Sequence, residues 1–285
     1  MQKGVRGARA ARAAPMTRVM RRAAREFEAL IFDVDGTIAD TEEAHRRAFN
    51  EAFCAYGLEW NWTPELYAEL LQVTGGKERI RRYIERLQLQ PAESERLLRL
   101  VPEIHGTKTR LYTELVDLGA LRPRAGVARL MTEARASGIQ LAIASTTSPQ
   151  NVESLLSSGL GADALSWFSA IVSGDVVSRK KPAPDVYDLV LGRLGVAPGR
   201  AVAFEDSAIG VLAAKSAGCF TVATPSSWTL GQDFAPADLL LPSLGDPDEP
   251  LDAATEWRIG ARFLGLGQLA TFHSAALRSE EEIAT

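Results

Sequence analysis

The sequence predicts an α/β fold, a doubly wound parallel sheet with a helical cap domain inserted into it. Two observations support this prediction: short, continuously apolar segments alternate with helical patterns, and residues 42–119 show helical patterns alone. Continuously apolar strands are typical of parallel sheets covered on both faces, because neither side of such a strand meets water. Strands that alternate with helices along the chain indicate a doubly wound sheet.

The expected strands are short apolar segments bounded by Gly, Ser, Asp or Pro. They cover 29–33, 139–145, 170–173, 201–205, 219–223 and 238–241, and helices are expected over 126–137, 151–157, 185–194 and 209–217. Ligands of doubly wound sheets bind at the carboxyl ends of the strands. Asp33, Ser145 and Asp206 stand at such ends, so we expect them to meet at one edge of the sheet.

The patterns also divide the chain into domains. A basic extension covers residues 1–26, the sheet core combines 27–41 with 120–245, the cap covers 42–119, and a tail with one or two short helices covers 246–285. Proline and glycine in the Leu121–Gly126 segment suit a hinge loop where the chain returns from the cap to the core. We assign no function to the tail.

The composition is that of an ordinary globular chain. Its 285 residues are 46% hydrophobic, enough for a sizeable core, and a net charge of -4 provides no overall attraction for nucleic acid. No apolar stretch approaches the roughly 20 residues that span a bilayer. Cys54 and Cys219 are too few and too far apart for a disulfide framework or a cysteine metal cluster, which favours a reducing compartment. We expect a cytoplasmic monomer without a nucleic-acid or membrane partner.

The N-terminal segment departs from this average. Residues 1–25 contain Lys3 and seven arginines, and no acid precedes Glu26. Such composition is typical of organelle transit peptides, which would place the protein in the plastid stroma or a mitochondrion. Met16 and Met20 leave open a later start of translation, and a disordered tail or a contact with nucleic acid or membrane are further alternatives.

The run Asp33-Val34-Asp35-Gly36-Thr37 carries the strongest chemical signal. Residues at i and i+2 of a strand point to the same side, so both carboxylates can face one site while Val34 faces the interior. Gly36 permits a sharp turn directly afterwards. Such a pair can hold a divalent metal and attack phosphorus, although Asp-Gly-Thr could also be a plain surface turn.

Three further segments fit the same site. Ser145 and Thr146 end a predicted strand and present hydroxyl and N–H groups suited to phosphate oxygens. In Lys180-Lys181-Pro182-Ala183-Pro184-Asp185, two prolines stiffen the backbone around a lysine. Glu205 and Asp206 add carboxylates suited to Mg2+. Taken singly, these segments could be a helix-capping loop, a solvated basic loop and helix N-caps.

Together, the four segments resemble the haloacid dehalogenase superfamily of phosphatases and phosphomutases over residues 27–245. The resemblance implies that Asp33 is the nucleophile that forms an aspartyl-phosphate, and that Asp35 is the acid and base. It also implies a phosphate site and a Mg2+ site. The phosphate site would use Ser145, Thr146 and Lys181, and the Mg2+ site would use Asp33, the backbone carbonyl of Asp35, Asp206 and the nearby Glu205.

Within the cap, Gly75-Gly76-Lys77-Glu78-Arg79 places glycines and two cations at the start of a helix, which suits a distal phosphate or a polyol. The spacing is not that of a Walker A loop, and an ordinary helix start with solvated cations is the alternative. A helical cap at this position is, in the superfamily, a device that closes over small metabolites.

The segments Asp40–Asn50, Trp60–Trp62 and Gly75–Ile80 are similar to those of CbbY-type sugar phosphatases. This resemblance implies removal of the 1-phosphate of xylulose-1,5-bisphosphate, an inhibitor of Rubisco, in a chain that serves the Calvin cycle. The implied contacts are Glu42 and His45 with the sugar, Gly76, Lys77 and Arg79 with the distal phosphate, and Tyr67 with the cap pocket. Tyr67 could equally be a core residue, and His45 a surface or interdomain histidine.

Two other activities fit the same motifs. A β-phosphoglucomutase-type enzyme shares Asp35, Thr41, His45 and the Lys-Pro-Ala-Pro-Asp run, and differs only in passing the phosphoryl group to a second hydroxyl. Another small sugar or polyol phosphatase is the third possibility. The motifs at the phosphoryl site do not separate these fates.

Overall fold

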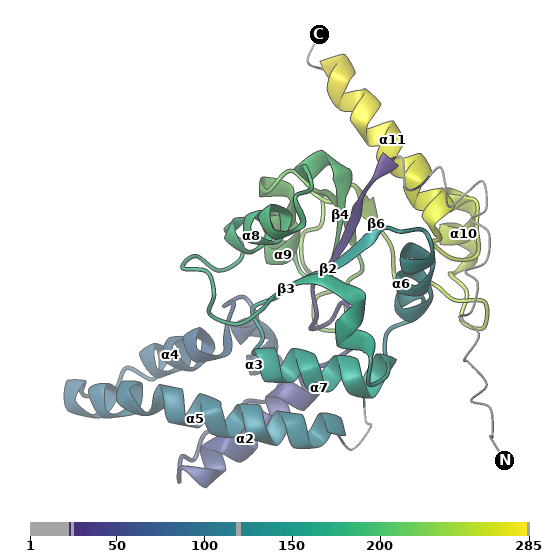
Figure 1. Ribbon diagram of the computed structural model, residues 1–285. Helices are drawn as coiled ribbons and strands as arrows, with labels where there is room; N and C mark the ends of the chain where they lie inside the picture. The colour runs from purple at the N-terminus through teal and green to yellow at the C-terminus, as the bar shows by residue number, and fades with distance from the viewer. Residues whose placement is uncertain (1–22, 24–25, 118–120, 284–285) are drawn as a thin grey trace, which may run out of the picture.

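The computed structural model describes residues 23, 26–117 and 121–283. Its centre is a sheet in the order β3-β2-β1-β4-β5-β6, with every neighbouring pair parallel (Figure 1). The strands are β1 (Ala29–Phe32), β2 (Gln140–Ala144), β3 (Phe168–Val172), β4 (Ala201–Glu205), β5 (Phe220–Ala223) and β6 (Leu239–Leu240). The predicted fold class is therefore confirmed.

Every strand end lies within two residues of the predicted one. The largest difference is at the start of β3, which begins at Phe168, directly after the 3-10 helix Ala164–Trp167. Phe168 is only partly buried and lies outside the continuous apolar run that begins at Ala170, so the sequence pattern did not include it in the strand. β2 ends at Ala144, which leaves Ser145 just beyond the strand.

Two hydrophobic layers cover the faces of the sheet (Figure 1). Helices α6 (Val127–Ala136) and α7 (Pro149–Leu160) pack on one face, where the rings of Phe32 and Phe204 stack with centroids 4.5 Å apart. Helices α8 (Asp185–Leu194) and α9 (Ala208–Ser216) pack on the other. Because both faces are covered, alternate strand residues enter separate cores, as the continuously apolar strands predicted.

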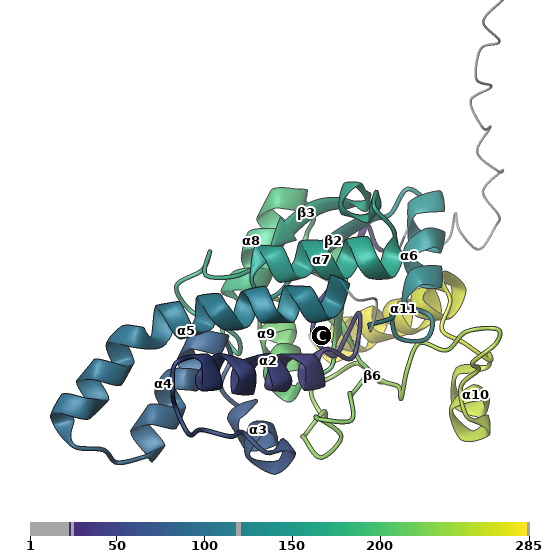
Figure 2. The same cartoon turned by 90° about the horizontal axis from the view of Figure 1, so that it is seen from below.

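Four helices lie between β1 and α6 and contain no strand among the described residues: α2 (Glu42–Ala55), α3 (Pro64–Leu70), α4 (Gly76–Arg86) and α5 (Pro91–Asp117). They enclose a core of their own in which Phe49, Phe53, Trp62 and Tyr67 are fully buried. Figure 2 shows these helices side by side, beyond α7 and the sheet. We call the four helices the cap; its exact boundaries stay a prediction.

Two linkers join the cap to the sheet, and they lie against each other. Ala39 and Pro123 form an isolated antiparallel bridge, and the N–H of Arg124 donates to the carbonyl of Ile38 at 2.8 Å. The chain therefore leaves and re-enters the core at one point.

The tail contains α10 (Ala253–Ile259) and α11 (Leu266–Ile283), the second of which is longer than the short helices expected from sequence. Leu264, Leu266 and Leu269 are buried against the layer that holds α6. The ring of His273 lies between Phe27 and Phe220, and its Nε2 is 3.0 Å from the carbonyl of Gly199. These contacts make the tail a part of the core.

Two further predictions concern the basic N-terminal extension and membrane-spanning segments. The basic extension falls almost entirely on residues 1–22 and 24–25, which lie outside the described residues, so its targeting role stays a prediction. None of the helices that the structure describes combines the length and apolar character needed to cross a membrane.

We expect Leu269→Ala to lower the free energy of unfolding by about 2–5 kcal/mol, because the side chain is fully buried and its removal leaves a cavity. Urea unfolding monitored by circular dichroism measures this change. Trp257→Ala in α10 is the control, since this side chain is 88% exposed and its loss should change stability by less than about 0.5 kcal/mol. Equal stability of the two variants would contradict the packing of the tail.

Candidate active site

The carboxyl ends of β1, β2 and β4 meet around one lysine. Asp33 directly follows β1, and its N–H donates to the carbonyl of Phe204 at 3.0 Å. Lys181 Nζ donates to Asp33 Oδ1 at 2.7 Å, Glu205 Oε1 at 2.6 Å and the carbonyl of Ala144 at 2.9 Å. All of these side chains are buried. The structure thus brings together Asp33, Lys181 and Glu205 as the sequence predicted.

Asp206, which follows β4, completes a carboxylate cluster. One oxygen each from Asp33, Glu205 and Asp206 lies within 4.8 Å of the others. Burial, followed by the charges of nearby carboxylates, raises the pKa of Asp33 to about 8 and the pKa of Asp206 well above its ordinary value, although Lys181 opposes the rise for Asp33. Three buried acids around a single ammonium leave an excess of negative charge.

This cluster fits a divalent cation with a preference for oxygen ligands. Glu205 Oε1 already accepts hydrogen bonds from Lys181 and from the hydroxyl of Tyr187, while its Oε2 has no partner within the described part of the chain. A buried oxygen without a partner is costly, and a cation nearby offsets that cost. The residues that could hold the ion are those predicted, with the side chain of Asp35 outside the carboxylate cluster.

Asp35 has different surroundings, although it is only two residues from Asp33. Its Oδ1 accepts a hydrogen bond from Thr41 at 2.7 Å and lies 2.9 Å from Nε2 of His45. Burial alone would raise the pKa of Asp35, but the contacts with His45 and Thr41 outweigh burial and hold that pKa below its ordinary value. The charged form of Asp35 is therefore favoured while that of Asp33 is disfavoured.

A cap lysine that the sequence reading missed extends this arrangement. Lys108 lies in α5, and its Nζ is 2.5 Å from Nδ1 of His45. Burial and the charge of Lys108 lower the pKa of His45, which favours the neutral imidazole. In the tautomer with the proton on Nε2, His45 donates to Asp35 and accepts from Lys108 at Nδ1. Lys108 lies on the buried face of α5 with Ile104 and Tyr112, at four-residue spacing. A lysine on an otherwise apolar helix face is the sequence signal that could have identified it.

The phosphate-binding candidates lie at the same edge. Ser145 is buried directly after β2, where its N–H donates to the carbonyl of Val172 and its Oγ accepts from the N–H of Thr147 at 3.2 Å. Ser145, Thr146 and Lys181 line one cavity with Asp33 and Asp35. The structure therefore collects all three of the predicted residues.

The cap residues divide into two groups. Glu42 and Arg79 line the cavity beside Asp33, and both bind the hydroxyl of Tyr67, which donates to Glu42 Oε2 at 2.7 Å and accepts from Arg79 Nη1 at 2.8 Å. Tyr67 itself is fully buried behind them and is not among the residues that line the cavity. The ring of Tyr67 packs in the core of the cap, which is the alternative interpretation of this residue. Only its hydroxyl contacts the polar side chains of Glu42 and Arg79.

Lys77 and Gly76 line a second cavity of about 680 Å3 between α5, the start of α7 and the loop after β3. Lys77 Nζ binds Asp175 Oδ2 at 2.8 Å, and Lys180 Nζ binds both Asp175 Oδ1 at 2.7 Å and Glu78 Oε2 at 2.8 Å. These four side chains join α4 of the cap to the core, and we call them the ionic bridge. Lys77 and Arg79 therefore do not converge on one point in this structure.

Comparison with known proteins agrees with this geometry. The family model for haloacid dehalogenase-like hydrolases matches residues 27–218. The chain belongs to this family. It is 48% identical to the plasmid form of protein CbbY from Cupriavidus necator over 225 residues, which cover 79% of this chain and 89% of that protein.

Solved structures agree as well. A crystal structure of a CbbY variant from Rhodobacter sphaeroides in complex with xylulose-1,5-bisphosphate has a TM-score of 0.71 and 47% identity, covering 76% of this chain and 94% of that one. A putative β-phosphoglucomutase from Thermotoga maritima has a TM-score of 0.54 and 30% identity, covering 75% and 94% of the two chains. The predicted family is confirmed, and the chain is a phosphatase-type hydrolase.

We expect Lys108→Met to lower kcat by at least about 10-fold, because His45 loses the donor that sets its tautomer and so positions Asp35 less well. The thermal midpoint should stay unchanged or rise, since a buried ammonium is replaced by an apolar chain of similar length. Steady-state phosphate release and thermal unfolding measure the two effects. Arg110→Met, on the exposed face of the same helix, is the matched control; equal kcat for both variants would show that the contact has no catalytic role.

Proposed function

We propose that the protein is a Mg2+-dependent sugar-phosphate phosphatase that converts xylulose-1,5-bisphosphate to xylulose 5-phosphate. The observation that carries the proposal is the pairing of two electrostatically different carboxylates, Asp33 beside Lys181 and Asp35 beside His45. The similarity to the CbbY structure that holds xylulose-1,5-bisphosphate supports the choice of substrate.

The reaction has two steps in this proposal. The Asp33 carboxylate attacks phosphorus, the bond from phosphorus to the sugar oxygen breaks, and Asp35 donates a proton to that oxygen. Asp35 then accepts a proton from water, whose oxygen attacks phosphorus; the bond from phosphorus to the Asp33 oxygen breaks, which releases inorganic phosphate and restores the Asp33 carboxylate. Before the first step, the negative charge of the bound phosphate opposes the ionisation of Asp35 and so favours the protonated acid.

Cations and N–H groups hold the phosphoryl group during both steps. Lys181, Ser145 and Thr146 line the cavity beside Asp33 and would bind the phosphoryl oxygens. The carboxylates of Asp33 and Asp206, the backbone carbonyl of Asp35 and the nearby Glu205 would hold Mg2+. When bound, Mg2+ would neutralise the acids and the developing charge on the phosphoryl oxygens.

The cap would bind the remainder of the substrate. In this proposal Glu42 and His45 contact sugar hydroxyls and Arg79 binds the distal phosphate; Glu42 and Arg79 line the cavity beside Asp33, and His45 lines the adjoining one. The cavity beside Asp33 measures about 80 Å3, well below the roughly 300 Å3 of pockets that enclose small-molecule ligands, so in this proposal the cap moves away from the core for the substrate to enter. Lys77 would reach a phosphate only after the ionic bridge opens.

A phosphomutase is the second candidate, favoured by the similarity to the Thermotoga protein and by the contacts of Asp35 with Thr41 and His45. Phosphate release measured with Mg2+ and with EDTA separates the candidates. Strong Mg2+-dependent preference for xylulose-1,5-bisphosphate over ribulose-1,5-bisphosphate and hexose phosphates supports the proposal. Formation of glucose 6-phosphate from β-glucose 1-phosphate with little free phosphate would identify a mutase. Hydrolysis of other sugar or polyol phosphates in preference would assign the protein to the third class.

We expect Asp33→Asn to abolish phosphate release and any labelling of the protein by phosphorylated substrate, because an amide does not act as the nucleophile. The fold should persist, since the substitution removes one of three crowded acids. Circular dichroism and mass spectrometry of the quenched reaction provide the measurements. Residual turnover above one per cent of the wild-type rate would contradict a mechanism through Asp33.

We expect Arg79→Ala to raise KM for a bisphosphate at least about 10-fold more than KM for a monophosphate, because only the bisphosphate loses a charge-assisted contact. Lys77→Ala tests the predicted distal-phosphate role of Lys77 in the same way. If Lys77 serves only in the ionic bridge, its removal should change both KM values alike, as Asp175→Asn should. Equal effects of Arg79→Ala on both substrates would remove Arg79 from the distal site.

A further inference from the structure

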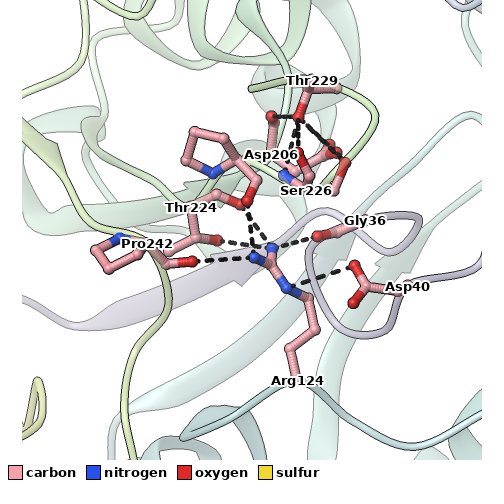
Figure 3. Close-up of polar contacts among 9 residues, drawn as sticks. Gly36, Asp40, Arg124, Asp206, Thr224, Ser226, Thr229 and Pro242 are labelled. Carbon is pink, nitrogen blue, oxygen red and sulfur yellow. Dashed lines mark hydrogen bonds and ion pairs between the residues drawn. The ribbon is translucent and has the colours of Figure 1, made fainter. Parts of the chain in front are cut away.

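Arg124 stands at the junction of the cap linkers and the sheet, and its guanidinium is almost enclosed, with 11% of the side chain exposed. Nη1 donates to the carbonyls of Gly36 at 2.5 Å and Thr224 at 2.6 Å, and Nη2 donates to those of Pro225 at 2.9 Å and Pro242 at 3.2 Å. Figure 3 shows these carbonyls arranged around the one side chain. A single planar group therefore holds segments that lie 88 to 118 residues away from Arg124 in sequence.

The first of these carbonyls belongs to the catalytic turn. Gly36 follows Asp35 directly and has a φ of +80°, a conformation that favours glycine. A Cβ at Gly36 would overlap the carboxylate of Asp206, so the turn and this carboxylate are in close contact. Any displacement of the Gly36 carbonyl therefore changes the position of the turn against Asp206.

The carbonyls of Thr224 and Pro225 belong to the loop that orients Asp206. Ser226 Oγ donates to Asp206 Oδ2 at 2.9 Å, and Thr229 Oγ1 donates to the backbone carbonyl of Asp206 at 2.7 Å. Figure 3 shows this group next to the Arg124 contacts. Arg124 thus binds both the turn and the loop that contact the carboxylate of Asp206.

The same residue also contacts the cap linkers. Its N–H donates to the carbonyl of Ile38, and its Nε is 3.6 Å from Asp40 Oδ1 in the first linker. Guanidinium is suited to this place because its five donors lie in a fixed planar fork, whereas an ammonium is a point charge on a flexible stem.

We propose that Arg124 is a positioning residue, which sets the catalytic turn and Asp206 at the separation that the metal and the phosphoryl group require. This inference rests on the proposed function, in which Asp206 holds Mg2+. Residues that orient metal ligands typically contribute about 10- to 100-fold to metal affinity. The role is distinct from plain stabilisation, because its loss changes the geometry of a ligand.

Arg129, which lies in α6 shortly after Arg124, offers a matched control. Its Nη2 donates to the carbonyls of Gly245 at 2.9 Å and Leu264 at 3.0 Å, and 16% of its side chain is exposed. Arg129 therefore also joins distant segments through backbone carbonyls, but it does so at the tail and not at the carboxylate cluster. Arg129→Met removes similar contacts without touching the site.

The test measures Mg2+ binding to the full-length protein by isothermal titration calorimetry without substrate, together with kcat, KM and the thermal midpoint. We expect Arg124→Met to weaken Mg2+ binding by about 10-fold or more and to lower kcat more than it raises KM. Arg124→Lys should lie between wild type and Arg124→Met, because the charge stays and the fork is lost. Arg129→Met should lower the thermal midpoint and keep the wild-type Mg2+ affinity.

A second variant tests the path through the loop. Thr229→Val removes the hydrogen bond to the carbonyl of Asp206 while Arg124 stays in place. We expect it to weaken Mg2+ binding too, and the double variant with Arg124→Met to show less than the sum of the two losses in binding free energy, because both act through one loop.

Several outcomes would overturn the inference. Mg2+ affinity of Arg124→Met within two-fold of wild type, or an equal loss in Arg129→Met, would reduce Arg124 to a structural residue. If Arg124→Met does not fold, Arg124→Lys decides, and wild-type Mg2+ affinity in that variant would overturn the role. A wild-type protein that binds no Mg2+ would instead contradict the proposed function, which keeps the two failures distinguishable.

Discussion

The buried contact between the ammonium of Lys181 and the carboxylates of Asp33 and Glu205 is the constraint on which the active site depends. Asp33 follows β1 and Glu205 ends β4. These strands and β2 are parallel neighbours in register, so their carboxyl ends lie at the same edge of the sheet. One ammonium does not balance three buried acids once Asp206 is included. The site therefore favours a further cation, and a phosphoryl group can approach only when the negative charge has been offset.

Asp33 and Asp35 lie in the same short segment but have different electrostatic surroundings. Asp33 depends on the sheet and on Lys181, whereas Asp35 depends on His45 and Lys108, which both belong to the cap. Because cap helices form its surroundings, these contacts of Asp35 exist only when the cap lies against the core. The two carboxylates thus differ in the direction of their pKa shifts, and a cation held beside Asp33 would favour the charged form of that group.

Two contact regions fix the cap against the sheet at different distances from the hinge. The linkers meet near Arg124, at the carboxylate cluster, and the ionic bridge joins α4 to the loop that carries Lys180. The ionic bridge is partly exposed, so its contribution is small and sensitive to salt. The buried guanidinium contacts of Arg124 are screened much less, so salt should affect this junction less than the ionic bridge. The tail does not contribute to this junction through His273, whose partners Phe27, Phe220 and Gly199 all belong to the sheet core.

The amino-acid sequence alone determined the layers of the fold, because apolar periodicity is local: β4 and α8 begin and end where the pattern predicts. It also identified Asp33, Lys181 and Asp206, since each stands beside a strand end or a stiff turn. Tertiary structure alone decided the roles of Lys108, Arg124 and Tyr67. Their partners lie about 25 to 100 residues away in sequence, and no local spacing encodes such contacts. The contact of Lys77 is likewise decided by tertiary structure. Its position near Arg79 in the sequence suggested a shared phosphate site, whereas in the fold its ammonium pairs with Asp175.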